Sequence, residues 1–261
     1  MKRLVLSGLL VLFGVWAFAQ TAEEILRRVE EQGFFGTGRE SLYASLAVTI
    51  QERGQPQVDY AFRVWAREFP DGTVKVLLLY AAPEDVAGTL FLAHVPKEGA
   101  TRMWLYLPEL GLVKELVGET ERRGEFLAGS GITYEDISKG FSYRADYASE
   151  LSGEEVRDGH PTWRLELSPK TPGLEWNRIV LWVHREHAFV VRAEFYDREG
   201  KLSRILSVPE LVTDALGTRP AALRVEDLGK GSWAEVRILE REVGAVPDAY
   251  FEPTNLPKLQ L

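Results

Sequence analysis

The sequence predicts a mainly β protein with a few helices (α+β), built on one antiparallel meander of ten or more strands that curls partway around a hydrophobic cavity. Three observations support this prediction. Runs rich in β-branched and aromatic residues recur at short intervals and are separated by turn residues. Strand and helix patterns do not alternate, which disfavours a parallel doubly wound sheet. Several runs are apolar on both faces, so both faces need cover, and a sheet of this length must curl.

The chain begins with the pattern of a secretory signal peptide. Lys2 and Arg3 precede an apolar run over 4–16, and Ala17-Phe18-Ala19 supplies small residues before a cleavage point. The apolar run is short for a membrane anchor. We therefore expect cleavage after Ala19, a single domain over 20–261, and export from the cytoplasm. Gln20 rather than cysteine would follow the cut, so we expect no lipid-modified N-terminus.

Composition narrows the functional classes. The chain has 31 basic and 39 acidic residues, which gives a net charge of −8. It lacks a basic patch of the kind that binds nucleic acid, so we expect no nucleic-acid partner. The chain has no cysteine, which excludes disulfides, thiol chemistry and a cysteine metal site.

One helix is predicted at the start of the mature chain. Thr21 and Glu24 have the spacing of a capping box, with an apolar stripe of Ile25, Leu26 and Val29 behind them. Gly33 is expected to end the helix.

Strand patterns follow over most of the remaining chain. Turn residues such as 70–72, 158–159 and 198–200 separate them, as in hairpins. The predicted strands are 41–51, 58–68, 74–81, 88–95, 102–107, 112–117, 142–150, 162–168, 176–184, 188–197, 201–208, 221–227 and 232–241.

Two segments depart from this pattern. Residues 118–141 are polar and glycine-rich, and a short helical turn is expected at 134–139. The tail over 244–258 contains three prolines.

The run at 102–107, RMWLYL, shows the problem of two apolar faces. Met103 and Leu105 would point to one face and Trp104 and Tyr106 to the other. We interpret the second apolar face as the wall of a ligand cavity on the concave side of the curved sheet.

The sequence offers little catalytic chemistry. It lacks the GxSxG, Walker, GxGxxG and HExxH motifs. His184 and His187 fall in a predicted hairpin turn, where we expect solvated side chains rather than a metal site. The pairs 84–85 and 135–136 are acidic, but lie near turn or helix starts, where carboxylates favour the helix dipole. We expect no catalytic residue, no metal and no cofactor.

Three segments carry a resemblance to a known family. PEDVAGTLFL at 83–92, MWLYLPELGLVKEL at 103–116 and FLAGSGITYEDI at 126–137 resemble the outer-membrane lipoprotein-sorting, or LolA-like, proteins of bacterial envelopes. The strand pair at 190–206 and the ending at 248–256 are also similar to that family.

The resemblance implies an unclosed antiparallel β-barrel with helices covering its mouth, whose cavity takes the acyl chains of lipoproteins or other lipids. It also implies an inner-membrane transporter as donor and an outer-membrane acceptor. We expect a lid with a glycine hinge, and the candidate lid residues are Phe126, Gly129, Ser130 and Tyr134. The candidate cavity residues are Trp65, Leu78, Leu90, Trp104, Tyr106 and Trp182.

A soluble carrier without catalytic activity is therefore the predicted function. Two alternatives stay open. One is a regulatory half-barrel that senses lipids or protein partners in envelope-stress signalling. The other is an enzyme acting on lipids, for which no nucleophile with a base can be assembled from the sequence.

Overall fold

The computed structural model describes residues 20–33, 41–97, 99–139, 142–215 and 217–261. The predicted signal peptide lies outside the described residues. The described strands form one antiparallel sheet with the order β6-β5-β4-β3-β2-β1-β13-β12-β11-β10-β9-β8-β7. Their bounds are β1 (Leu42–Gln51), β2 (Val58–Glu68), β3 (Val74–Ala82), β4 (Leu90–Val95), β5 (Arg102–Leu107), β6 (Leu112–Glu115), β7 (Tyr147–Arg157), β8 (His160–Pro169), β9 (Arg178–His184), β10 (Val190–Tyr196), β11 (Leu202–Asp214), β12 (Gly217–Asp227) and β13 (Ser232–Val243).

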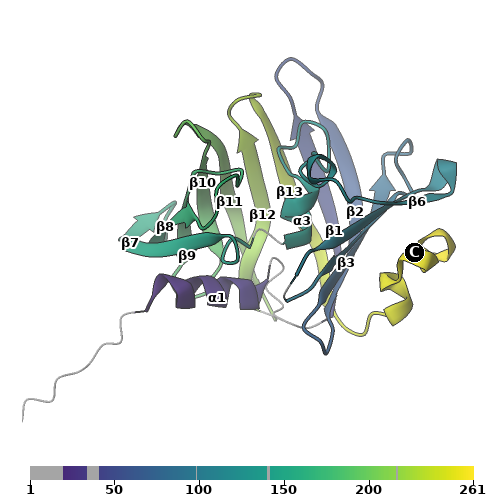
Figure 1. Ribbon diagram of the computed structural model, residues 1–261, viewed down its shortest axis with the longest axis horizontal. Helices are drawn as coiled ribbons and strands as arrows, with labels where there is room; N and C mark the ends of the chain where they lie inside the picture. Colours follow the sequence, from purple (N-terminus) through teal and green to yellow (C-terminus); the bar gives the residue numbers. More distant parts are fainter. Residues whose placement is uncertain (1–19, 34–40, 98, 140–141, 216) are drawn as a thin grey trace, which may run out of the picture.

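The first and last strands meet in the middle of the sheet. β1 pairs with both β2 and β13, so the chain builds one arm from β1 to β6 and the other from β7 to β13. The two arms curve toward one side without closing, and β6 and β7 are the free edges (Figure 1). This is the predicted unclosed antiparallel barrel.

Every predicted strand is present, and most bounds agree within a few residues. β7 begins at Tyr147, five positions later than the predicted start at 142. β11 and β12 are longer than predicted and extend together into a hairpin.

The helices lie mostly on the concave side. Helix α1 (Ala22–Gln32) has the predicted capping box, in which the Thr21 side chain accepts from the Glu24 N–H and Glu24 accepts from the Thr21 N–H. It buries Ile25 and Leu26 against the inner side of the β7 arm. Helices α2 (Glu119–Arg122) and α3 (Tyr134–Lys139) lie in the connection from β6 to β7.

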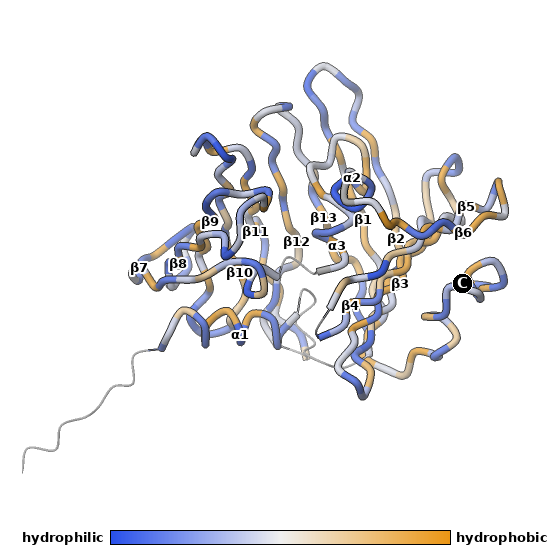
Figure 2. Tube along the Cα trace, in the orientation of Figure 1, coloured by the Kyte–Doolittle hydropathy of each residue, from blue (hydrophilic) through white to orange (hydrophobic). Residues whose placement is uncertain are grey.

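The sheet has two separate apolar layers. The inner layer runs across the concave face and includes Leu46, Phe62, Met103 and Leu181, together with α1. The outer layer lies on the convex side of the arm from β1 to β6. Figure 2 shows apolar residues recurring along the strands in both arms.

The C-terminal segment covers the outer layer. Two short 3-10 helices, η2 (Asp248–Phe251) and η3 (Pro253–Lys258), lie on the convex side of the sheet (Figure 1). They bury Val246, Phe251 and Leu256 in the outer layer. The second apolar face of RMWLYL is thus covered by the protein's own tail, and the interpretation of that face as a cavity wall is wrong.

Candidate functional site: a lid segment inside the curved sheet

The connection between the two free edges enters the concave side of the sheet. We call residues 116–139 the lid segment. It leaves β6, contains α2, folds into a compact loop over 124–133 and ends in α3 (Figure 1). Because its ends are attached to opposite edges of an open sheet, the lid segment covers the inner layer where a closed barrel would have further strands.

Phe126 is the deepest aromatic group of the lid segment. It is 7% exposed, and its ring centroid lies 5.5 Å from Phe62, 5.2 Å from Tyr80 and 5.9 Å from Phe91. Leu127 and Ile132 of the same loop are also buried in the inner layer. A connecting loop therefore adds its own buried side chains to the inner face of the sheet.

Local hydrogen bonds explain the loop's shape. The Phe126 N–H donates to the Ile132 carbonyl at 2.7 Å, which closes the loop on itself. The Ser130 hydroxyl, fully buried, donates to the Leu127 carbonyl at 2.6 Å and accepts from the Ile132 N–H at 3.1 Å. Gly129 has φ +76°, a conformation that glycine adopts without steric cost.

Glu125 links the loop to the sheet. Its carboxylate accepts from the Gly129 N–H at 3.0 Å and the Gly131 N–H at 3.2 Å. Lys230, in the turn between β12 and β13, lies 2.6 Å from the same carboxylate. The Lys230 side chain is 53% exposed, so this contact is accessible to water.

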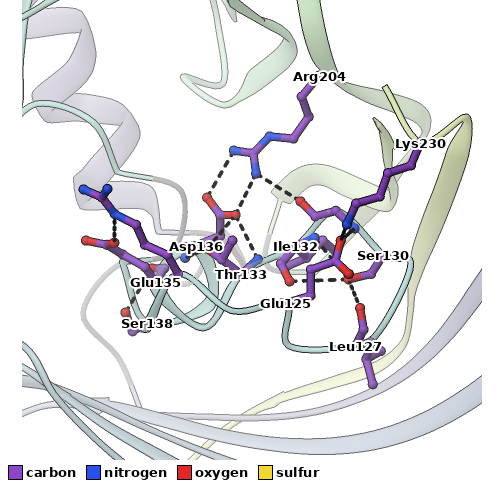
Figure 3. Close-up of polar contacts among 12 residues, drawn as sticks. Glu125, Leu127, Ser130, Ile132, Thr133, Glu135, Asp136, Ser138, Arg204 and Lys230 are labelled. Atoms are coloured by element: carbon purple, nitrogen blue, oxygen red, sulfur yellow. Dashed lines mark hydrogen bonds and ion pairs between the residues drawn. The ribbon is translucent and has the colours of Figure 1, made fainter. Parts of the chain in front are cut away.

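A buried ion pair holds the other end of the lid segment. Arg204 of β11 donates to both carboxylate oxygens of Asp136, at 2.8 and 3.2 Å, and to the Gly131 carbonyl at 3.0 Å (Figure 3). Asp136 also caps α3 by accepting from the N–H and hydroxyl of Thr133, both at 3.0 Å. The helix-start role expected for this acidic pair is therefore present, and Arg204 adds a contact across to the sheet.

Charge and burial oppose each other around this ion pair. Burial is the largest single influence on Arg204 and acts to lower its pKa. The Asp136 carboxylate, Tyr143 and Glu175 together outweigh burial and raise the pKa of Arg204, so the guanidinium stays charged. Burial raises the pKa of the nearby Glu175 carboxyl, with Arg204 acting in the opposite direction. A small pocket of about 60 Å³ opens here between Asp136, Glu175 and Tyr143.

The structure brings only some of the predicted site residues together. Leu78, Phe126 and Tyr134 belong to the inner layer, and Gly129 and Ser130 form the tip of the lid loop.

The other candidates lie outside the concave face. The residues packed in the outer layer under the C-terminal segment are Trp65, Leu90, Trp104 and Tyr106. Trp182 lies on the opposite side of β9 from the inner-layer residues, with the guanidinium of Arg157 4.5 Å from its ring. The expectation that these five line the concave face is wrong because alternation defines two faces of a strand without saying which one is inside. Ligand binding by any candidate residue stays a prediction.

Arg204 is the main residue that the sequence analysis missed. Within β11 it shares a face with Leu206 and Val208, which are inner-layer residues. An arginine on an otherwise apolar strand face needs a buried partner. The alternation of Arg204 with Leu206 and Val208 in the sequence could therefore have indicated a buried ion pair.

The histidines also differ from expectation. His184 is 6% exposed, and its ring lies 5.5 Å from His160 and 4.8 Å from His187. Its Nδ1 accepts from the N–H groups of Glu186 and His187. The prediction of a solvated turn side chain is therefore wrong for His184, which organises the turn. Among the described residues, no group of three or more potential ligands could hold a metal ion.

Comparisons with known proteins agree with this fold. A sequence model of a family described as an uncharacterized protein matches residues 72–258, more than half of the chain. No curated protein matches the sequence.

Three solved structures illustrate the likeness. A DUF1329-family protein from Desulfovibrio piger has a TM-score of 0.80 at 24% identity, covering 90% of this chain and 97% of the other. An outer membrane lipoprotein-sorting protein domain from Vibrio parahaemolyticus has a TM-score of 0.79 at 24% identity, with 90% and 98% covered. A LolA-superfamily protein from Nitrosomonas europaea has a TM-score of 0.69 at 19% identity, with 90% and 98% covered. At these identities the likeness shows the fold.

Proposed function

The chain belongs to the family whose model spans residues 72–258, and we propose that it is a carrier that binds the acyl chains of lipoproteins or other lipids on the inner face of its curved sheet. The fold shared with the lipoprotein-sorting domain supports this proposal. The observation that carries it is the position of Phe126, Leu127 and Ile132. These buried side chains fill the inner face from a loop that is tied down by a small number of polar contacts.

The structure corresponds to a closed form in this proposal. A ligand chain would take the place of the lid loop's apolar side chains rather than occupy a preformed cavity. Each buried Phe, Leu or Ile side chain contributes roughly 1.5–3 kcal/mol, and each buried CH₂ of an acyl chain about 0.8 kcal/mol. Burying several methylene groups of an acyl chain therefore offsets the free energy lost when one side chain is displaced. Because the two free energies are similar, the carrier can both bind and release its ligand.

The predicted signal peptide and the resemblance to lipoprotein-sorting proteins together suggest a cellular context. The carrier would act in the periplasm, receive its ligand from an inner-membrane transporter and deliver it to an outer-membrane acceptor. In this proposal the protein binds without catalysis and needs no cofactor. None of the helices in the described ranges has the length and apolar composition that crossing a bilayer requires.

A disulfide that locks the lid loop provides the test. A Cβ added at Gly129 would lie 2.4 Å from Glu52 Cγ, so side chains at positions 52 and 129 touch, and cysteines at these two positions are chosen to form the bond. The chain has no native cysteine, so the Glu52→Cys/Gly129→Cys variant can form only this bond within one molecule. Binding of a dansyl-labelled fatty acid is measured by fluorescence before and after reduction.

We expect the reduced variant to bind the fatty acid and the oxidised variant to bind at least about tenfold more weakly, a difference of about 1.4 kcal/mol. The Glu52→Cys single variant is the control, and redox conditions should leave its binding unchanged. Equal binding by the locked and reduced forms would contradict displacement of the lid loop, and no binding by the wild-type chain would contradict the carrier function.

A further inference from the structure

An open pocket of about 630 Å³ lies beside the lid segment. Its size is within the range of small-molecule sites. Three separate parts of the chain line it: the lid segment, the turn between β8 and β9, and the turn between β10 and β11. The lining residues are Thr120, Arg123, Pro172, Gly173, Leu174 and Arg198.

The charged residues that line this pocket are both arginines, in a chain whose net charge is −8. Arg198 Nη2 donates to the Gly173 carbonyl at 3.2 Å, which holds the guanidinium at the rim. Arg123 Nε forms an ion pair with Glu135 Oε2 at 3.8 Å. Two arginines from different parts of the chain thus line one hollow, and arginine matches phosphate oxygens with paired N–H donors.

We propose that this pocket binds a phosphate group and, resting on the proposed function, that the phosphate belongs to the head group of the lipid whose chains enter the inner face. The pocket is open to solvent, as a polar head group requires, whereas the inner layer beside it is apolar. One amphiphilic ligand would therefore contact both regions.

The position of Arg123 connects the pocket to the lid. The small pocket beside Asp136 shares Arg123 and Leu174 with the larger one. A phosphate on Arg123 competes with Glu135 of α3, one residue from the Asp136–Arg204 ion pair.

The test compares two lipids with identical short chains, dioctanoyl phosphatidylglycerol and dioctanoylglycerol, by calorimetry on residues 20–261. Inorganic phosphate alone is titrated separately. The variants are Arg198→Gln and, as a matched control from the same turn, Lys201→Gln. We expect the wild-type chain to bind the phosphate-bearing lipid about tenfold or more tightly, a difference of about 1.4 kcal/mol, because charge-assisted hydrogen bonds are stronger than neutral ones. Arg198→Gln should remove most of that preference and Lys201→Gln should keep it.

The outcomes separate this proposal from the carrier function. Equal binding of the two lipids by the wild-type chain, without phosphate binding, overturns the phosphate site and leaves the carrier function standing. Binding of inorganic phosphate that Arg198→Gln removes, without binding of either lipid, supports the site with a free phosphate ester as its source and contradicts the carrier function. Equal losses in Arg198→Gln and Lys201→Gln indicate general charge attraction and overturn the proposal.

Discussion

Arg204 donates to both carboxylate oxygens of Asp136, joining β11 to α3 at 2.8 and 3.2 Å. The Arg204 guanidinium also lies 4.3 Å from the Phe195 ring and 4.8 Å from the Trp176 ring. Aromatic faces and one carboxylate thus surround a buried cation. The lid segment begins after β6, at the edge of one arm. This ion pair joins its far end to β11, which belongs to the other arm.

Asp136→Asn should loosen the lid and destabilise the protein. Removing one member of a buried ion pair leaves the other charge uncompensated, which costs about 3–5 kcal/mol. We expect faster amide hydrogen exchange over 124–139 and a lower free energy of unfolding. The control is Arg27→Gln, which removes an exposed pair with Glu31 and should change little. Unchanged exchange over the lid in Asp136→Asn would contradict this role.

Phe126→Ala should make the inner face easier to occupy. The substitution removes a ring that contacts three aromatic residues of the sheet. We expect a stability loss of about 3–5 kcal/mol and tighter binding of a dansyl-labelled fatty acid. Val117→Ala, at a residue of the same segment that is 75% exposed, should change neither quantity. Weaker fatty-acid binding by Phe126→Ala would show that the ring helps to hold ligand rather than to exclude it.

Gly129→Ala should disturb the lid loop more than its backbone strain alone explains. The new Cβ would lie 2.2 Å from Glu52 Oε1, whereas at Gly54, which has nearly the same φ, it meets nothing within 4 Å. Gly54→Ala therefore measures the cost of positive φ by itself, about 1–2 kcal/mol. Denaturant unfolding should show the larger loss for Gly129→Ala, and Glu52→Ala should reduce the difference. Equal losses in the two glycine variants would contradict a close contact.

Acidification should destabilise the protein partly through His184. Burial lowers the pKa of His184, and the charges of His187 and His160 act in the same direction. The unfolded chain then takes up the proton more readily, so stability is lost as pH falls from about 6.5, the ordinary histidine value, toward the folded pKa. His184→Asn keeps an acceptor for the turn N–H groups and should flatten the fall in unfolding free energy between about pH 7 and 5. Burial also lowers the pKa of His94, so some pH dependence should remain. An unchanged slope would contradict the assignment to His184.

Phe251→Ala tests the cover of the outer layer. Phe251 is fully buried and its ring lies 5.7 Å from Phe69. We expect a loss of about 3–5 kcal/mol in unfolding free energy, with fatty-acid binding retained because the inner layer is on the other side of the sheet. Leu239→Ala, at an exposed position, is the control. A loss of binding as large as that of stability would place ligand on the outer face.

The amino-acid sequence by itself determined the elements of this protein. The positions of the strands, the capping box at Thr21 and the helical turn at Tyr134–Lys139 depend on residues that are near each other in the chain, so local patterns reveal them. The lid residues Phe126 and Tyr134 also come from one continuous segment.

Only the tertiary structure decided which face of each strand lies inside. Side chains alternate between the two faces of a strand, which places Trp104 and Met103 on opposite faces. This alternation is the same whichever face of the sheet is concave. The choice depends on two distant segments: the lid segment, which fills the inner face, and the C-terminal tail, which covers the outer one. The pairing of Arg204 with Asp136 spans 68 positions for the same reason, because it exists only once the sheet has curled.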